Sequence, residues 1–179
     1  MSTVTPTIGS EPIDTAPPFA IDAHQDPRAF RDALGRYPTG VALVAAATPD
    51  GPVGMAVNSF TSVSLAPPLI SFCAMLSSSS WAGIRPGGRF AVSVLRLHHE
   101  GVARRFSQRG IDRFAETSWL TSPSGHPILA DALSWFDATI ETVADAGDHE
   151  LVIARVEACS QPGEGDPLVF FSGRYANLA

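Results

Sequence analysis

Short apolar runs, separated by turn residues, occupy most of the chain and predict a protein built mainly from β-strands. Val41–Ala47 and Val53–Val57 flank the turn Pro49-Asp50-Gly51-Pro52, and this arrangement is typical of a β-hairpin. Five later runs are also predicted strands, namely Leu69–Met75, Gly88–Leu95, Leu133–Val143, Leu151–Ala158 and Pro167–Tyr175. Their number and length favour one sheet-rich domain.

A few segments show helical spacing instead. Asp26-Pro27 is a typical helix start, with a capping side chain followed by proline in the first turn. The apolar residues that follow predict a short amphipathic helix over residues 27–36. A second helix is predicted over residues 98–107, where His98 and His99 would point about 100° apart. We therefore expect one surface and one packed histidine, and no metal site.

The two ends of the chain differ in composition. Residues 1–24 are rich in proline, serine and threonine and poor in large apolar groups, which predicts a flexible arm. Residues 25–179 are then the folded domain. No run of about 18 apolar residues and no basic-then-apolar leader is visible, so we expect no membrane span, no signal peptide and a cytoplasmic protein.

Charge and cysteine content narrow the function classes. The net charge is −6, which argues against a nucleic-acid partner, because such a protein needs a basic face to meet phosphates. Cys73 and Cys159 lie far apart and match no metal spacing. We interpret them as two buried small apolar residues in a reducing compartment, although a disulfide is not excluded.

Two polar stretches interrupt the strands. Asn58–Ser64 places an amide and four hydroxyls between two apolar runs, and Ser77–Ser80 places four serines before Trp81. Serine hydroxyls and turn amides are suitable donors to a phosphate, but a flexible serine loop has the same composition. From these residues alone, ordinary polar loops and ligand-binding loops both remain open.

Several motifs, in order along the chain, resemble those of the flavin reductase family, the reductase components of two-component flavin monooxygenases. They are Pro38-Thr39-Gly40-Val41, Asn58–Ser64, Gly88–Val92, Asp112-Arg113-Phe114, Gly125–Leu129, Gly147-Asp148-His149 and Pro167–Tyr175. The resemblance covers about Phe30 to Tyr175. It implies a mainly β fold with a few helices, the FMN-binding split β-barrel, in a homodimer.

The resemblance also implies a set of site residues. His149 would be the catalytic residue, facing the nicotinamide and the flavin. The flavin-binding residues would be Pro38, Thr39, Gly40, Asn58, Ser59, Phe60, Thr61, Ser78, Ser79, Ser80, Ser93, Phe171 and Tyr175. Ser80 stands where the family usually has threonine, which keeps the hydroxyl. Ser93 replaces an asparagine and so loses an amide near the flavin.

The implied activity is hydride transfer from NADH or NADPH to FMN, with FAD as a further substrate, and delivery of reduced flavin to a separate monooxygenase. Such a reaction requires no strong general base, because the cofactor carries the chemistry. The sequence accordingly lacks a dinucleotide-binding glycine motif, a Walker loop and a nucleophile elbow. The alternatives are an FMN-binding protein that is not a reductase, such as an electron carrier or flavin store, and a split-barrel module for another ligand such as haem.

Overall fold

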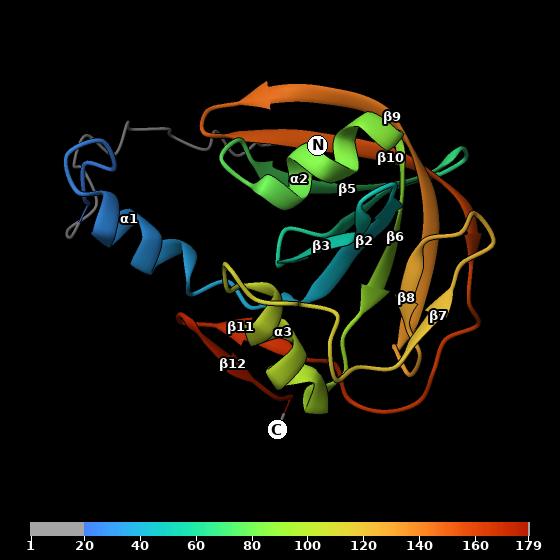
Figure 1. Ribbon diagram of the computed structural model, residues 1–179. Coiled ribbons are helices and arrows are strands. Elements are labelled where there is room, and N and C mark those ends of the chain that lie inside the picture. Colours follow the sequence, from blue (N-terminus) through green and yellow to red (C-terminus); the bar gives the residue numbers. More distant parts are fainter. Residues whose placement is uncertain (1–19, 179) are drawn as a thin grey trace, which may run out of the picture.

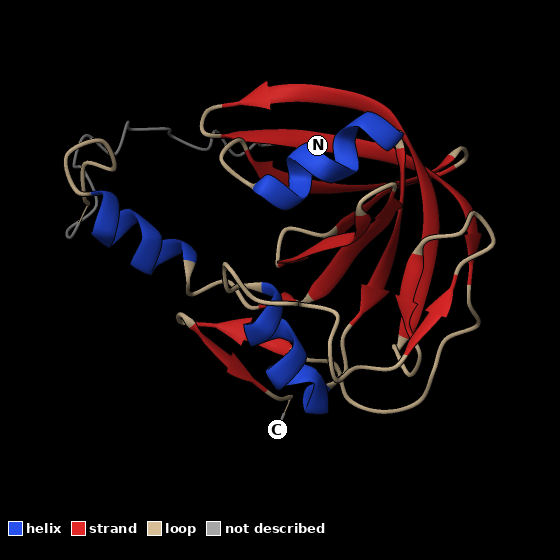
Figure 2. Cartoon of the chain, in the orientation of Figure 1, coloured by secondary structure: helices blue, strands red, loops and turns tan. Residues whose placement is uncertain are grey.

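The structure, a computed structural model, describes residues 20–178. Its centre is a seven-stranded antiparallel sheet in the order β3-β2-β6-β9-β10-β5-β4, which curves into an incomplete barrel (Figures 1 and 2). The edge strands are β3 and β4, and the short loop over residues 58–60 joins them across the opening. Most of the predicted N-terminal arm, residues 1–19, lies outside the described residues.

The elements follow one another in short steps. The sheet contains β2 (Ala42–Thr48), β3 (Gly51–Val57), β4 (Thr61–Leu65), β5 (Pro68–Met75), β6 (Arg89–Val94), β9 (Ser134–Ala146) and β10 (His149–Cys159). The smaller strands are β1 (Thr39–Gly40), β7 (Trp119–Thr121), β8 (Pro127–Leu129), β11 (Val169–Phe171) and β12 (Arg174–Ala176). The helices are α1 (Pro27–Leu34), α2 (Ser79–Ile84) and α3 (Glu100–Phe106), with single 3₁₀ turns at Arg85–Gly87 and Leu97–His99.

Both faces of β2 are buried, which explains its unbroken apolar sequence. Val44 points into the barrel interior, where it meets Phe72 and Phe90, both fully buried. Leu43 points the other way, into a second cluster that α3, β8 and β11 contribute to. Alternate residues of one strand thus serve two cores, as the period of an extended chain requires.

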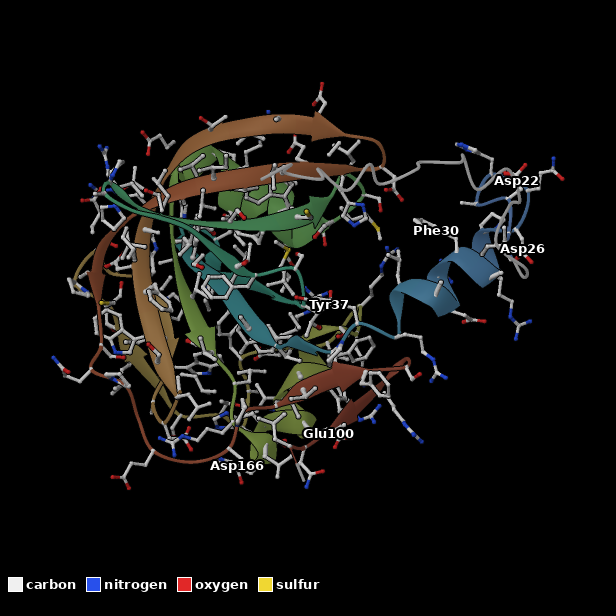
Figure 3. The ribbon with its side chains drawn as sticks, turned by 180° about the vertical axis from the view of Figure 1, so that it is seen from behind. Asp22, Asp26, Phe30, Tyr37, Glu100 and Asp166 are labelled. Atoms are coloured by element: carbon white, nitrogen blue, oxygen red, sulfur yellow. The ribbon has the colours of Figure 1, made fainter. Side chains whose placement is uncertain are left out.

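The smaller elements pack around the barrel. The three-stranded sheet β1-β11-β12 and α3 lie at one end of it, and the β7–β8 hairpin lies along its side (Figure 1). Helix α1 begins at the cap Asp26, whose carboxylate accepts the Ala29 N–H, and it projects from the body without a buried residue (Figure 3). None of the helices in residues 20–178 is long and apolar enough to cross a membrane.

Most element predictions are confirmed, but the last predicted strand, the second predicted helix and the burial of the cysteines differ from the structure. The hairpin and the strands predicted between Leu69 and Ala158 lie where the apolar runs predicted them, but the single strand predicted over Pro167–Tyr175 is two short strands, β11 and β12, joined by a turn. The helix expected over 98–107 is divided into the Leu97–His99 turn and α3, which changes the directions of its side chains. The cysteines are free, but Cys159 is exposed and Cys73 is half-buried, so the prediction of two buried residues is wrong.

Candidate functional site

A cleft of about 360 Å³ lies at the opening of the barrel. One wall is the end of β3 and the other is formed by the ends of β5 and β10. Three consecutive β3 residues, Met55, Ala56 and Val57, line it. Since successive side chains of a strand point to opposite faces, three in a row mean that the backbone edge of β3 faces the cleft.

One end of the cleft is rich in hydroxyl groups. Ser77, Ser78, Ser79 and Ser80 all line it. The Ser78 hydroxyl caps α2 by accepting the Trp81 N–H at 3.2 Å, which turns the serine run back toward the cleft. Ser80 is 6% exposed, and its hydroxyl accepts a hydrogen bond from Arg113.

Two arginines bring positive charge to this hydroxyl-rich end. Arg109 and Arg113 both line the cleft. Arg113 is held in place by the carbonyl oxygens of Gly54, at 3.0 Å from Nη1, and Gln108, at 2.8 Å from Nε. Two guanidinium groups beside four serines form a suitable site for a phosphate. Sequence reasoning missed both arginines, although the Asp112-Arg113-Phe114 motif had drawn attention to the segment.

The polar loop after β3 forms the middle of the cleft. Ser59 accepts the Cys73 N–H through its hydroxyl at 2.9 Å, and this bond ties the loop to β5. Asn58 is exposed and lines the cleft together with two neighbouring cavities. Ser59 therefore fixes the loop to β5, and Asn58 presents its side-chain amide to the cleft.

His149 stands at the start of β10, where it pairs with Met75 at the end of β5. Its Nδ1 lies 2.7 Å from Oδ1 of Asp148, and the hydrogen bond from His149 lowers the pKa of that carboxyl. The ionised carboxylate accepts, so the proton resides on Nδ1 of the ring. Nε2 is then the nitrogen left to interact with a ligand.

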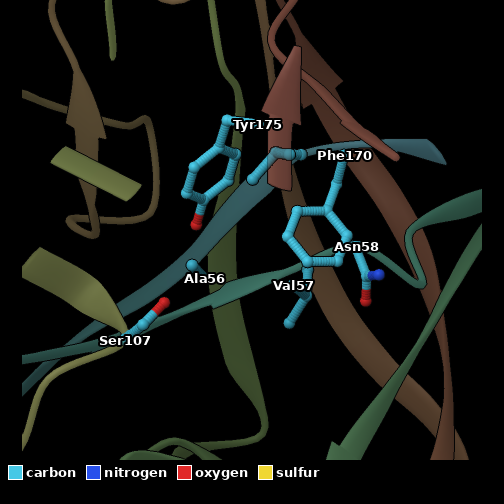
Figure 4. Close-up of a pocket in the computed structure, with 7 residues that line it drawn as sticks. Ala56, Val57, Asn58, Ser107, Phe170 and Tyr175 are labelled. Carbon is cyan, nitrogen blue, oxygen red and sulfur yellow. The ribbon is translucent and has the colours of Figure 1, made fainter. Parts of the chain in front are cut away.

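Two further cavities adjoin the cleft at Asn58. One, of about 210 Å³, is lined by Ala56, Val57, Phe170, Tyr175 and Ser107, and the hydroxyls of the last two point toward the same space (Figure 4). The other is a groove of about 1070 Å³ between α1 and the barrel, and His149 lines it too. Asn58 and His149 therefore lie where separate binding spaces meet.

The structure brings many of the predicted residues together. Asn58, Ser59, Ser78, Ser79, Ser80 and His149 line the cleft, Tyr175 lines the smaller cavity, and Thr39 lines the groove. Pro38 and Gly40 precede and follow Thr39 in the chain but line none of these spaces. Gly40 instead helps to hold β1 against β11, where it pairs with Val169.

The remaining predicted residues point elsewhere. Ser93 is 2% exposed and its hydroxyl accepts the Leu129 N–H at 3.0 Å, so it joins β6 to β8 inside the fold. Phe60 packs on Phe136, with ring centroids 5.6 Å apart.

Thr61 lies exposed on the edge strand, where its hydroxyl reaches the Ser62 carbonyl oxygen. Phe171 lies beside Arg36, and its neighbour Phe170 lines the cavities instead. This difference of one residue follows from the pairing of Phe170 with Thr39 and Tyr175.

His98 and His99 do not diverge as their spacing predicted. Nε2 of His98 lies 2.9 Å from one oxygen of Asp131, and Nε2 of His99 lies 3.0 Å from the other. Burial lowers the pKa of His99, and its Nδ1 accepts the Arg96 N–H at 3.0 Å. The proton of the neutral ring is thus on Nε2, which donates to Asp131 and has no lone pair for a metal.

Comparisons with known proteins give one consistent result. The family model described as flavin reductase like domain matches residues 34–179. A flavin reductase of Pseudomonas putida is 43% identical over 155 residues, which cover 86% of this chain and 91% of that protein. The reductase subunit HsaB of a flavin-dependent monooxygenase from Rhodococcus jostii is 41% identical over 153 residues, covering 86% and 78%. Nitrilotriacetate monooxygenase component B from Mycobacterium thermoresistibile superposes with a TM-score of 0.84 at 37% identity, covering 88% and 89%.

Proposed function

The chain belongs to the flavin reductase family, and from this premise we propose that its cleft holds FMN while a reduced nicotinamide docks at His149. Family membership makes the protein an NAD(P)H-dependent flavin reductase, as the sequence motifs predicted. The flavin supplies the chemistry when bound, because its N5 accepts the hydride that the nicotinamide C4 releases. The protein has to bind, orient and shield the two ring systems.

The residues present fit FMN. The cleft volume of about 360 Å³ falls within the range of about 300–1,000 Å³ that small-molecule sites occupy. The assignment rests on one end of the cleft, where four serines and two arginines lie together. This end is positively charged although the whole chain has a net charge of −6. A dianionic phosphate is the group that such donors bind best, through charge-assisted hydrogen bonds.

The rest of the cleft suits the ring system. The exposed edge of β3 and the amide of Asn58 offer donors and acceptors to a polar ring edge. Donors aimed at that edge stabilise the negative charge of the reduced ring. FAD fits the same arrangement only if its adenylate extends past Arg113, where a cavity of about 440 Å³ begins. We therefore propose FMN as the preferred flavin and FAD as a second substrate.

His149 has the role of placing the nicotinamide. Its Asp148 partner fixes the ring orientation, and the side chain lines both the cleft and the adjoining groove. A histidine at this boundary can hold the nicotinamide against the flavin without taking a proton from it. Its removal should then slow hydride transfer more than it weakens FMN binding.

We propose that two copies of the chain form a homodimer and that reduced flavin passes to a separate monooxygenase component. Two exposed apolar side chains on the edge strand support the dimer, since Leu65 is 94% exposed and Val63 is 49% exposed. The relative HsaB, named as the reductase subunit of a flavin-dependent monooxygenase, supports the partner.

The test follows NADH and NADPH oxidation by absorbance, with and without FMN or FAD. FMN-dependent oxidation that is about tenfold slower in His149→Ala, with an unchanged KM for FMN, is the expected result. An FMN-binding electron carrier would instead retain the flavin tightly and turn over slowly. Absence of oxidation with every pair of substrates would overturn the reductase assignment.

A further inference from the structure

The groove between α1 and the barrel is larger than the proposed flavin cleft and adjoins it. It encloses about 1070 Å³, against about 360 Å³ for the cleft, and the two share Asn58, Ser59 and His149. It therefore begins where the nicotinamide is proposed to lie and extends away from the flavin toward α1. Figure 3 places Tyr37 at this junction of α1 and the barrel.

The far side of the groove carries positive charge. Arg31 lies in the last turn of α1, Arg36 lies just beyond its end, and both line the groove together with one carboxylate, Asp32. Two guanidinium groups and one carboxylate leave this lining with one net positive charge, whereas the whole chain carries −6. This local positive charge favours the binding of an anion in the groove.

Contacts with the β11–β12 turn fix the position of the Arg36 side chain in the groove wall. Its Nη1 donates to the Ser172 hydroxyl at 3.2 Å, and its guanidinium lies 6.0 Å from the centroid of the Phe171 ring. The Ser172 N–H in turn donates to the Gly35 carbonyl oxygen at 2.8 Å, which joins the β11–β12 turn to the end of α1. A guanidinium already placed in this way loses little freedom when it binds a ligand.

We propose that this groove binds the diphosphate and adenosine part of NADH or NADPH, with Arg31 and Arg36 holding the diphosphate. The inference rests on the proposed function, since it extends the nicotinamide position at His149 outward. A dinucleotide has its two negative charges between a nicotinamide end and an adenosine end. The groove offers matching groups, since His149 and the two arginines all line it.

The experiment compares two hydride donors that share the nicotinamide but differ in the diphosphate. NADH carries it, and reduced N-benzylnicotinamide does not. Arg31→Ala and Arg36→Ala should each raise the KM for NADH about tenfold, the effect of losing one charged contact, with kcat and the KM for FMN unchanged. The KM for the benzyl donor should stay the same, and Arg36→Lys should restore part of the NADH affinity.

Arg28→Ala is the matched control, because Arg28 lies on the same helix but does not line the groove. Wild-type KM for NADH in both groove variants would overturn the inference while leaving the reductase intact. An equal loss with the benzyl donor would also overturn it, because the arginines would then act on the fold. An effect confined to NADPH would assign them to its 2′-phosphate instead. An inactive wild-type protein with both donors would remove the proposed function, and the inference with it.

Discussion

Glu150 joins the strand that carries His149 to the helix that carries the serines, and its removal should destabilise the protein in a measurable way. The side chain is 3% exposed. Its Oε2 accepts the indole N–H of Trp81 at 2.5 Å, and its Oε1 lies 2.7 Å from Nη1 of Arg85. Trp81 is itself 2% exposed, so its N–H has no water to replace a lost acceptor.

The magnitude follows from these two contacts. In Glu150→Ala the buried indole N–H loses its acceptor, which costs about 1–3 kcal/mol. The Arg85 side chain is 55% exposed and regains water, so its half of the pair contributes at most about 1 kcal/mol. We expect a total loss of about 3 kcal/mol for Glu150→Ala and about 1 kcal/mol for Glu150→Gln, whose amide oxygen still accepts from Trp81.

Urea titration of the flavin-free protein measures these losses, and two further variants make the test specific. Glu157→Ala is the control, because Glu157 lies on the same strand with its side chain 48% exposed and should change stability by less than about 0.5 kcal/mol. A double-mutant cycle with Trp81→Phe should give a coupling of about 1–3 kcal/mol. Coupling near zero, or equal losses for the alanine and glutamine variants, would refute the reasoning.

Three other predictions test the flavin end, the packing and the pH response. Arg113→Met should raise the KM for FMN about tenfold with little change in kcat, and an unchanged KM would refute the phosphate assignment. Gly54→Ala would place its Cβ 2.7 Å from Cε1 of Phe106 and should cost about 1–3 kcal/mol, whereas Gly101→Ala, with open space around it, should leave the melting temperature unchanged or raise it. Burial lowers the pKa of His126, so its contribution to stability is full above about pH 6.5, the unfolded value, and is lost as the pH falls below it. Urea titrations between about pH 8 and pH 5 should therefore show a smaller loss in His126→Gln than in the wild type, and parallel losses would contradict this.

The fold was predictable where the signal is local. The apolar run along Ala42–Ala47 and the turn before Gly51 are properties of neighbouring residues, and they decide strand and hairpin without distant contacts. Family motifs then supplied the arrangement, and the comparisons confirm the family and the split-barrel fold. Asn58 was found for the same reason, because it lies inside such a motif, and the serines were found as a run of four hydroxyls before Trp81.

The site details that were missed depend on contacts between distant segments. Arg113 reaches Ser80 and the carbonyl of Gly54, which come from two separate parts of the chain. The convergence of His98 and His99 requires Asp131 and a 3₁₀ turn, neither of which the helical spacing contains.

The sequence pattern also could not predict that Phe170, and not Phe171, lines the cavities. It is set by pairing with Thr39, on a strand from the other end of the domain. Such facts depend on register and packing, which a local pattern does not encode.

The incomplete closure of the barrel has a consequence for the protein without its ligand. A closed barrel pairs every strand with two neighbours, but here the outer side of β3 keeps unpaired backbone groups along Met55–Val57. An unpaired edge of this kind is a template for strands of other chains and a starting point for aggregation. A flavin in the cleft would lie where the missing strand would be, and it would shield the edge. Supply of flavin during synthesis should therefore decide how much of the protein stays in solution, as well as how much is active.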